Sequence, residues 1–262
     1  MIDTSNIKMI TPGRLILISL FIFLSACQSP ATSLTKEIKE IREGVLQGYL
    51  SKEDIPNSLK LLPAPPEKGS AAIKLDQEIA KKYITLNNAE RYQQAVIDAD
   101  LSFPNATKTF NVVLDIPITE KTTPHLYMLL RRSLADAGLS TYAAKNYYQR
   151  KRPFMLNGAP ICTPEDEAGL RKDGSYPSGH AAIGWAWALI LVEVFPEKTN
   201  LILQRGKQFG LSRNVCNVHW YSDVVAGRMM GAAAVARLHA NETFMADMRA
   251  AKDEVRALKT GK

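Results

Sequence analysis

Three short stretches in the C-terminal half of this sequence carry side chains whose types and spacing suit the chemistry of a phosphate group. They span residues 145–153 (KNYYQRKRP), 177–180 (PSGH) and 212–223 (SRNVCNVHWYSD). Among their residues are a Lys, two Arg, two His, a Ser and an Asp at positions that favour phosphoryl transfer. In that reaction fixed cations neutralise the non-bridging oxygens, one imidazole attacks phosphorus, and another protonates the leaving oxygen.

His219 and Asp223 are the candidate nucleophile and its orienting group. They lie four residues apart and lead into a helix of small residues, so we expect their side chains to meet on one helix face. A carboxylate bonded to one imidazole nitrogen fixes the tautomer and leaves the other nitrogen free to attack. Taken alone, the pair would more simply be a polar pair on a helix surface.

His180 is the candidate general acid. It follows Pro177, Ser178 and Gly179 and opens a long apolar segment, so these residues are expected at a helix N-terminus, which attracts anions. The Ser178 hydroxyl and the Gly179 N–H would bond phosphate oxygens, and glycine lets the ligand approach the backbone. The alternative is a helix-capping Ser beside a buried structural His.

Lys145, Arg152 and Arg213 are the candidate phosphate cations. Two turns of helix would place Lys145 and Arg152 on one side, and Arg213 adds a second guanidinium. Arginine matches phosphate oxygens bidentately, whereas lysine acts as a point charge. Each could also be a solvated surface charge. His125 and His239 belong to no such group, and we expect them to be structural.

The elements that must position these residues are helical. Helical periodicity extends over residues 71–100, 124–137, 140–149 and 224–238, with Gly138 as an expected helix stop. Residues 181–195 are apolar nearly all round, which predicts a helix buried in a large core. Alternating strand patterns are nearly absent. The sequence predicts one all-α domain over residues 70–262.

The N-terminal segment reads as a bacterial lipoprotein signal followed by a tether. Residues 1–26 contain the apolar run LILISLFIFL, and small residues precede Cys27, which resembles a lipobox. Lipidation of Cys27, with Gln28 after it, would place the chain in the outer membrane on its periplasmic side. An ordinary secretory signal would make the chain periplasmic. Residues 27–69, with a helical pattern and then several prolines, would be a lipid-anchored tether.

Export favours a disulfide between Cys162 and Cys216, because they form an even pair in an oxidising compartment. Two buried free thiols are the alternative. The formal net charge of +7 suits anionic substrates without requiring them. No basic run, zinc-finger spacing or aromatic–basic repeat supports binding of a nucleic-acid polymer.

The three motifs together resemble the signature of the type 2 phosphatidic acid phosphatase superfamily, which also contains the vanadium haloperoxidases. Lysine, six residues and Arg-Pro are followed by Pro-Ser-Gly-His, and then by Ser-Arg, five residues, His, three residues and Asp. The run GSYPSGH at 174–180 is similar to that of bacterial class A non-specific acid phosphatases. The likeness extends from about Leu59 to about His239.

This resemblance implies an all-α phosphatase that hydrolyses phosphate monoesters of broad specificity, such as nucleotides, sugar phosphates and aryl phosphates, at acidic pH. His219 would form a phosphohistidine, and Asp223 would orient the His219 ring. His180 would act first as the general acid and then as the general base. Phosphotransfer to alcohols could compete with hydrolysis of the phosphohistidine. The phosphate ligands would be Lys145, Arg152, Ser178, Gly179 and Arg213. The resemblance further implies no metal or other cofactor, inhibition by vanadate, a homo-oligomer, and pairing of the two cysteines.

Three other functions share parts of this pattern. A vanadate-dependent haloperoxidase would use the same pocket. A membrane lipid phosphatase would need several apolar spans of about 20 residues, which the sequence after the signal does not contain. A lipid-anchored phosphate-binding protein would need the cations but neither histidine nor the orienting Asp.

Overall fold

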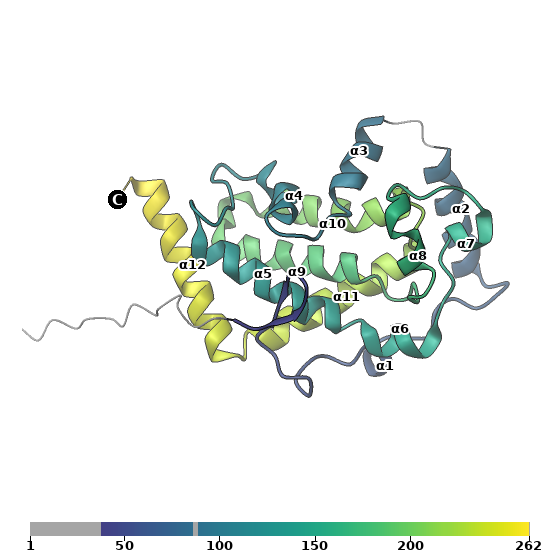
Figure 1. Ribbon diagram of the computed structural model, residues 1–262, viewed down its shortest axis with the longest axis horizontal. Helices are drawn as coiled ribbons and strands as arrows, with labels where there is room; N and C mark the ends of the chain where they lie inside the picture. Colours follow the sequence, from purple (N-terminus) through teal and green to yellow (C-terminus); the bar gives the residue numbers. More distant parts are fainter. Residues whose placement is uncertain (1–37, 86–88, 262) are drawn as a thin grey trace, which may run out of the picture. The chain divides into compact units, whose positions relative to one another are not determined.

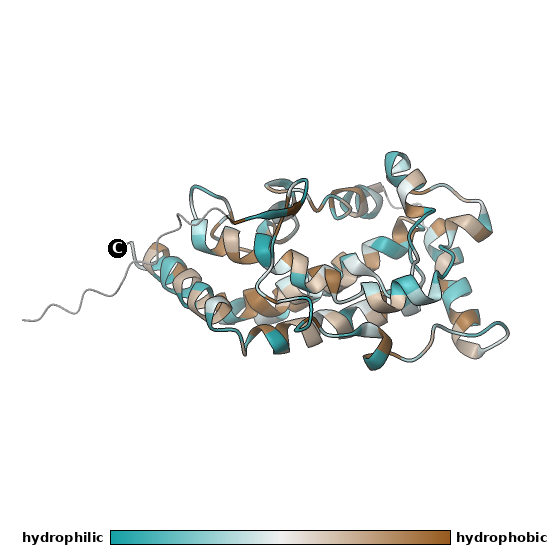
Figure 2. Cartoon of the chain, turned by 60° about the horizontal axis from the view of Figure 1, so that its bottom comes forward, coloured by the Kyte–Doolittle hydropathy of each residue, from teal (hydrophilic) through white to brown (hydrophobic). Residues whose placement is uncertain are grey.

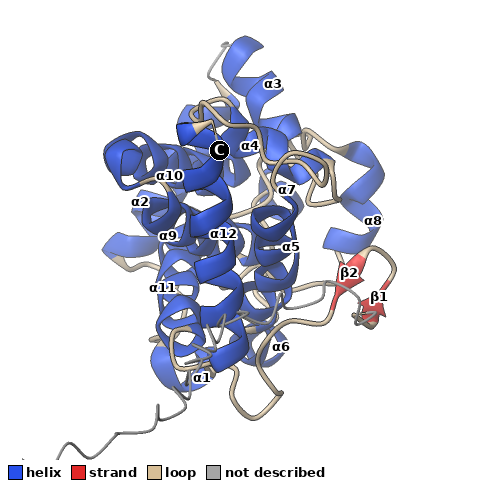
Figure 3. Cartoon of the chain, turned by 90° about the vertical axis from the view of Figure 1, so that its left-hand side faces the viewer, coloured by secondary structure: helices blue, strands red, loops and turns tan. Residues whose placement is uncertain are grey.

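The structure, a computed structural model, describes residues 38–85 and 89–261. In this part of the chain helices follow one another, and a short two-stranded hairpin forms the sheet (Figures 1 and 3). The predicted all-α fold is therefore confirmed. The predicted signal of residues 1–26 and the predicted lipidation site Cys27 lie outside the described residues. No helix within the described ranges is long and apolar enough to cross a membrane.

The helices and strands occur in a simple order along the chain. The strands are β1 (Glu40–Arg42) and β2 (Val45–Leu46), which pair antiparallel. The α-helices are α1 (Ser58–Leu61), α2 (Ala71–Ile84), α3 (Ala89–Ile97), α4 (Lys108–Asn111), α5 (Pro124–Leu139), α6 (Tyr142–Tyr148), α7 (Phe154–Asn157), α8 (Glu167–Leu170), α9 (Gly179–Val194), α10 (Thr199–Val215), α11 (Tyr221–Leu238) and α12 (Glu242–Thr260).

Helix α9 is the centre of the bundle, as its apolar sequence predicted. It packs against α5, α10 and α11, and α12 covers α5 (Figure 1). The small residues of α11 allow close contact with α9, because a Cβ at Gly227 would lie 2.3 Å from the carbonyl oxygen of Ser178. This contact brings the N-terminus of α11 beside the N-terminus of α9, where two of the sequence motifs lie.

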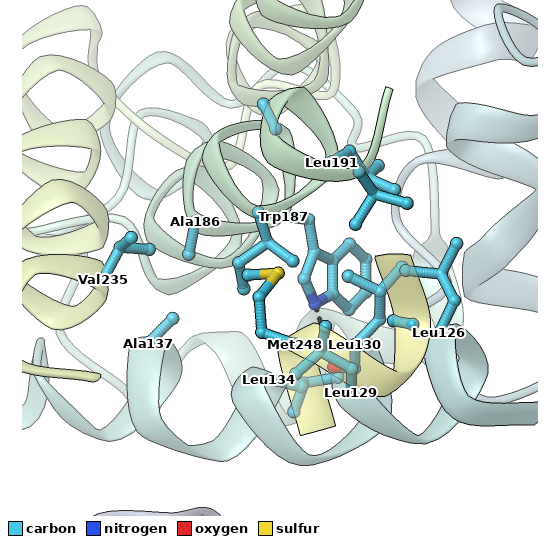
Figure 4. Packing of buried hydrophobic residues seen from close by; sticks show 14 of the residues in the cluster. Leu126, Leu129, Leu130, Leu134, Ala137, Ala186, Trp187, Leu191, Val235 and Met248 are labelled. Carbon is cyan, nitrogen blue, oxygen red and sulfur yellow. Dashed lines mark hydrogen bonds between the residues drawn. The ribbon is translucent and has the colours of Figure 1, made fainter. Parts of the chain in front are cut away.

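The core surrounds Trp187, which is 1% exposed on α9. Its indole N–H donates a 3.0 Å hydrogen bond to the carbonyl oxygen of Leu130 on α5, while leucines of α5 and Met248 of α12 pack around the ring (Figure 4). Burying an aromatic side chain stabilises such a core by roughly 1.5–3 kcal/mol. Figure 2 shows the resulting pattern on the C-terminal helix, which has one hydrophobic and one hydrophilic side. The core thus fixes α5, α9 and α12 as one body.

The segment before residue 70 differs from the prediction. The compact unit begins at Ile38, so residues 38–69 belong to the domain and are not a tether. The spacing of apolar residues over 38–49 predicted a helix, but this segment contains a hairpin whose turn uses Gly44 at φ +72°. The buried residues of this segment include Leu46, Tyr49 and Leu50, and the backbone N–H groups of Tyr49 and Leu50 bond Asp136 of α5. Tertiary contacts therefore override the local helical pattern.

The predicted helix stop at Gly138 is also wrong, because α5 continues to Leu139. The predicted helix of residues 71–100 is two helices, α2 and α3. The predicted helices of residues 140–149, 181–195 and 224–238 correspond to α6, α9 and α11, with ends that differ by a few residues.

Candidate active site

His219 lies just before α11, with its two ring nitrogens in different environments. Nδ1 is 3.3 Å from Oδ2 of Asp223, and Nε2 is 3.1 Å from Nη1 of Arg152. A carboxylate accepts and a guanidinium donates, so Nδ1 carries the proton and Nε2 carries the lone pair. Burial and the neighbouring cations Arg152 and Lys145 hold the pKa of His219 well below its usual range. Both effects favour the neutral imidazole, whose Nε2 lone pair faces the cations of the pocket.

Asp223 sits in the first turn of α11 rather than on a shared helix face with His219. Its Oδ2 accepts a 2.8 Å bond from the backbone N–H of Trp220, and Oδ1 pairs with Arg150 at 2.6 Å. Burial raises the pKa of Asp223, while Arg150 opposes that shift. Arg150 also reaches Asp76 of α2 at 2.8 Å. A buried charge network thus fixes the carboxylate that orients His219.

His180 lies in the first turn of α9, where the sequence predicted it. Its Nε2 is 3.0 Å from the carbonyl oxygen of Ala99 and therefore donates a hydrogen bond. The nitrogen available for proton exchange is then Nδ1. Burial, followed by repulsion from Arg213, holds the pKa of His180 well below its ordinary value. His180 and His219 line the same pocket.

Ser178 and Gly179 form the N-terminus of α9. The Ser178 hydroxyl accepts a 3.3 Å bond from the N–H of Ala181, so Ser178 caps its own helix. Gly179 lines the pocket, which places the positive end of the helix dipole toward it. Ser178 contributes mainly by holding this helix end, since its backbone N–H donates to the carbonyl oxygen of Asp223 at 2.9 Å.

Lys145 and Arg152 meet, but not through a shared helix. Helix α6 ends at Tyr148 and Gln149 adopts a left-handed conformation (φ 43°), so Arg152 lies beyond the helix. Both cations instead pair with Asp173, at 3.4 Å for Lys145 and 3.0 Å for Arg152. Burial lowers the pKa of Lys145 to about 8, so its ammonium is charged at acidic and neutral pH.

Arg213 is a buried cation that forms no ion pair with another described residue. It lines the pocket and is 1% exposed, and its Nε and Nη1 contact no hydrogen-bond acceptor among the described residues. Burial and repulsion from Arg152 lower its pKa to about 10, which leaves the guanidinium charged. A buried, charged donor with unused N–H groups is unfavourable unless an anion binds there.

The pocket holds about 430 Å³. One end carries Lys145, Arg152, Arg213 and the two histidines, and the remaining wall is largely apolar. Its size suits a small organic phosphate. Among the described residues no group of three or more His, Cys, Asp or Glu side chains could hold a metal ion.

A disulfide joins two segments of the chain next to the site residues. Cys162 and Cys216 are joined as a disulfide with a Cα–Cα distance of 4.8 Å. The bridge ties the loop after α7 to the C-terminal end of α10, close to Arg213 and His219. Within the described residues, His125 and His239 are not among those lining the pocket, and His239 bonds Glu193 at 2.6 Å.

The structure places Lys145, Arg152, Gly179, His180, Arg213 and His219 along one pocket, with Asp223 bonded to His219. Ser178, which was also predicted to bind phosphate, is not among the lining residues and caps α9 instead. The structure adds three residues that sequence reasoning missed. Arg150 binds Asp223, and Asp173 binds Lys145 and Arg152, whereas Asp76 acts one step further out by binding Arg150. Arg150 lies inside the first motif and Asp173 immediately precedes the GSYPSGH run, so their positions were a usable signal. Asp76 lies far from the three motifs in the sequence, and no sequence signal pointed to it.

Comparison of the amino-acid sequence with known proteins identifies relatives of this chain. Residues 126–243 match the sequence model of the PAP2 superfamily. The non-specific acid phosphatase of Providencia stuartii is 46% identical over 212 residues, covering 80% of this chain and 86% of that protein. The non-specific acid phosphatase of Salmonella typhimurium is 40% identical over 211 residues (80% and 84%), and the acid phosphatase of Zymomonas mobilis is 40% identical over 202 residues (77% and 76%).

The chain therefore belongs to the PAP2 superfamily. Within that superfamily it groups with the bacterial non-specific acid phosphatases, and it is an enzyme of the acid phosphatase type, as the three motifs predicted.

Proposed function

We propose that this acid phosphatase hydrolyses phosphate monoesters of broad specificity, including nucleotides, sugar phosphates and aryl phosphates, through a phosphohistidine. The observation that carries the proposal is the arrangement of His219. Its Nδ1 faces Asp223, and its Nε2 faces the cations of the pocket. A neutral imidazole with a fixed tautomer beside three cations is suited to attack a phosphate ester.

In the first step Nε2 of His219 attacks phosphorus and the bond from phosphorus to the leaving oxygen breaks. Lys145, Arg152 and Arg213 neutralise the non-bridging oxygens, and the guanidinium of Arg152 turns from Nε2 to the phosphate. Protonated His180 gives its Nδ1 proton to the leaving oxygen, which departs as an alcohol. Asp223 stabilises the positive charge that develops on the phosphorylated imidazole.

In the second step a water attacks phosphorus and the phosphorus–nitrogen bond breaks. His180, now neutral, accepts the proton of the water at Nδ1 and is ready for the next cycle. Inorganic phosphate leaves and His219 is again neutral. An alcohol that replaces water at this stage would give phosphotransfer.

The role proposed for His180 predicts an acidic optimum. Burial and Arg213 lower the pKa of His180, whereas the negative charge of a bound ester raises it. Because His180 must be protonated to act as an acid, we expect kcat/KM to fall as the pH rises toward neutrality.

The test is turnover of 4-nitrophenyl phosphate by the full chain from pH 4 to 8, with excess chelator and with vanadate in parallel. We expect chelator-resistant, vanadate-inhibited hydrolysis that disappears in His219→Ala, with His239→Ala as the matched histidine control. Turnover lost equally in both variants would contradict the assignment. Turnover absent in a folded wild type that binds phosphate would instead indicate a binding protein, and bromide oxidation with vanadate and peroxide would indicate a haloperoxidase.

The intermediate can be tested separately with His180→Ala. 4-Nitrophenolate is a good leaving group that needs little protonation, so the first step survives while the second, which needs a base, slows. Rapid quenching should then show an acid-labile, alkali-stable phosphoenzyme. A phosphoenzyme that is alkali-labile and acid-stable would exclude phosphohistidine.

We further propose that Cys27 is lipidated and anchors the chain to the outer membrane, and that the phosphatase domain forms a homo-oligomer. The lipobox-like sequence before Cys27 supports the first proposal, and the resemblance to the phosphatases supports the second. Incorporation of labelled palmitate that is lost in Cys27→Ser tests the anchor. Sedimentation of the purified chain tests the assembly.

A further inference from the structure

The pocket is larger than a phosphate needs, and its outer wall is chemically distinct from its inner end. Besides the cations and histidines, its lining includes Leu101, Leu134, Leu139 and Ile183, whose side chains are apolar. Ile41 and Val45 of the hairpin complete this wall. An ester bound with its phosphate at Arg213 would therefore direct its organic part toward apolar residues and toward the hairpin.

The hairpin presents three neighbouring positions to the pocket. Arg42 pairs with Val45 across the turn at Gly44, and Ile41 precedes them. All three line the pocket, although Ile41 and Arg42 are also exposed to solvent. They therefore form the rim of the pocket rather than its base.

The hairpin is attached firmly to α5. The buried carboxylate of Asp136 accepts bonds from the backbone N–H groups of Tyr49 (2.9 Å) and Leu50 (2.9 Å). The guanidinium of Arg132 lies 3.7 Å from the centre of the Tyr49 ring. A Cβ at Gly48 would lie 2.2 Å from Asp136 Oδ1, so the backbone passes very close to this carboxylate. The rim is therefore held in place by the fold.

Arg42 supplies a positive charge at the rim of the pocket. No ion pair or side-chain hydrogen bond within the described ranges involves its guanidinium, whereas the nearby Arg131 pairs with Glu40 at 3.7 Å. Lys145 and Arg152, at the inner end, pair with Asp173. A guanidinium at a pocket rim without an acidic partner suits an anionic group on the ligand.

We propose that the β1–β2 hairpin is a specificity element for the leaving group: Ile41 and Val45 pack on an aromatic or other apolar organic group, and Arg42 binds a second anionic group attached to it. The preferred substrate class is then monoesters of apolar alcohols that carry another negative charge. This inference rests on the proposed function, because it assumes that the phosphate binds at the cationic end.

The test compares three phosphonates that cannot be hydrolysed, so that the reactivity of the leaving group does not enter. They are methylphosphonate, benzylphosphonate and 4-carboxybenzylphosphonate, and each is measured as an inhibitor constant against 4-nitrophenyl phosphate with the full chain. We expect benzylphosphonate to bind about tenfold more tightly than methylphosphonate, because part of the ring leaves water. The carboxylate should add about two- to fivefold at low salt, and less at high salt.

Three variants assign these gains to the hairpin. Arg42→Gln should remove the gain from the carboxylate and keep the gain from the ring. Ile41→Ser should reduce the gain from the ring and keep the affinity for methylphosphonate. Lys39→Gln is the matched control, because it removes a positive charge from the exposed start of the same hairpin without lining the pocket, and it should change neither gain.

The inference is overturned if the wild type binds the carboxylated and uncarboxylated ligands equally, or if Arg42→Gln and Lys39→Gln weaken the carboxylated ligand to the same extent. Equal binding of benzylphosphonate and methylphosphonate would overturn the apolar part. If the wild type does not hydrolyse 4-nitrophenyl phosphate, the proposed function fails, yet the three affinities, measured by calorimetry, still decide whether the hairpin recognises the organic group.

Discussion

Replacement of Arg150 tests whether a charge outside the phosphate pocket controls the nucleophile. Arg150 lies between two buried carboxylates, Asp223 (2.6 Å) and Asp76 (2.8 Å), which are 0% and 1% exposed in their side chains. Arg150→Met would leave both carboxylates without their shared cation. Removal of one partner from a buried ion pair typically costs about 3–5 kcal/mol. In a domain of this size that loss lowers the melting temperature by roughly 6–20 °C.

The pH dependence of this loss has a definite sign. Burial already raises the pKa of Asp223 above that of an unfolded Asp, and the loss of Arg150 raises it further. A carboxyl with a raised pKa binds its proton more tightly in the folded protein, so stability increases as the pH falls through that pKa. The deficit of Arg150→Met should therefore be smaller at pH 4 than at pH 7.

Activity should depend on pH in the opposite direction, with the largest loss at low pH. Asp223 must be ionised to hold the Nδ1 proton of His219, so its higher pKa moves the acidic limb of the kcat profile to higher pH. Thermal melting and kcat at several pH values measure both effects, and Arg150→Lys, which keeps the charge, should be intermediate. A variant that melts within about 2 °C of wild type with an unchanged acidic limb would refute the role assigned to Arg150.

Three further predictions concern the cation, the helix contact and the disulfide. Because burial lowers the pKa of Lys145 to about 8, inhibition by inorganic phosphate should weaken by up to about tenfold per pH unit above 8, and an unchanged inhibitor constant up to pH 9 would contradict this. Gly227→Ala should lower kcat/KM by about 10- to 100-fold because its Cβ would displace the Ser178 carbonyl, whereas Gly169→Ala, with open space around it, should be silent. Replacement of both bridged cysteines by Ser should lower the free energy of unfolding in denaturant by about 4 kcal/mol for the separation of 54 residues, and a loss below about 1 kcal/mol would show that the bridge is dispensable.

Local patterns in the sequence determined the fold class and the class of enzyme. The apolar run of residues 181–195 could only be a buried helix, and it became α9 at the centre of the bundle. The motifs gave the set of cations and histidines because each type of side chain has a narrow chemical use beside phosphate. The disulfide between Cys162 and Cys216 was favoured over free thiols because export was expected, and the structure contains it.

Only the tertiary structure decided which residues support that chemistry. Lys145 and Arg152 meet across Asp173 although α6 ends between them. Asp76 of α2 reaches the site by pairing with Arg150, 74 positions away in the sequence. The hairpin that replaces the expected tether depends on Asp136, which bonds Tyr49 from 87 residues away. Helical periodicity describes only neighbours along the chain, whereas these contacts depend on packing between distant segments and on buried charges that must find a partner. For that reason the sequence by itself determined the class of enzyme, and the three-dimensional structure decided how the candidate site residues are held and what else lines their pocket.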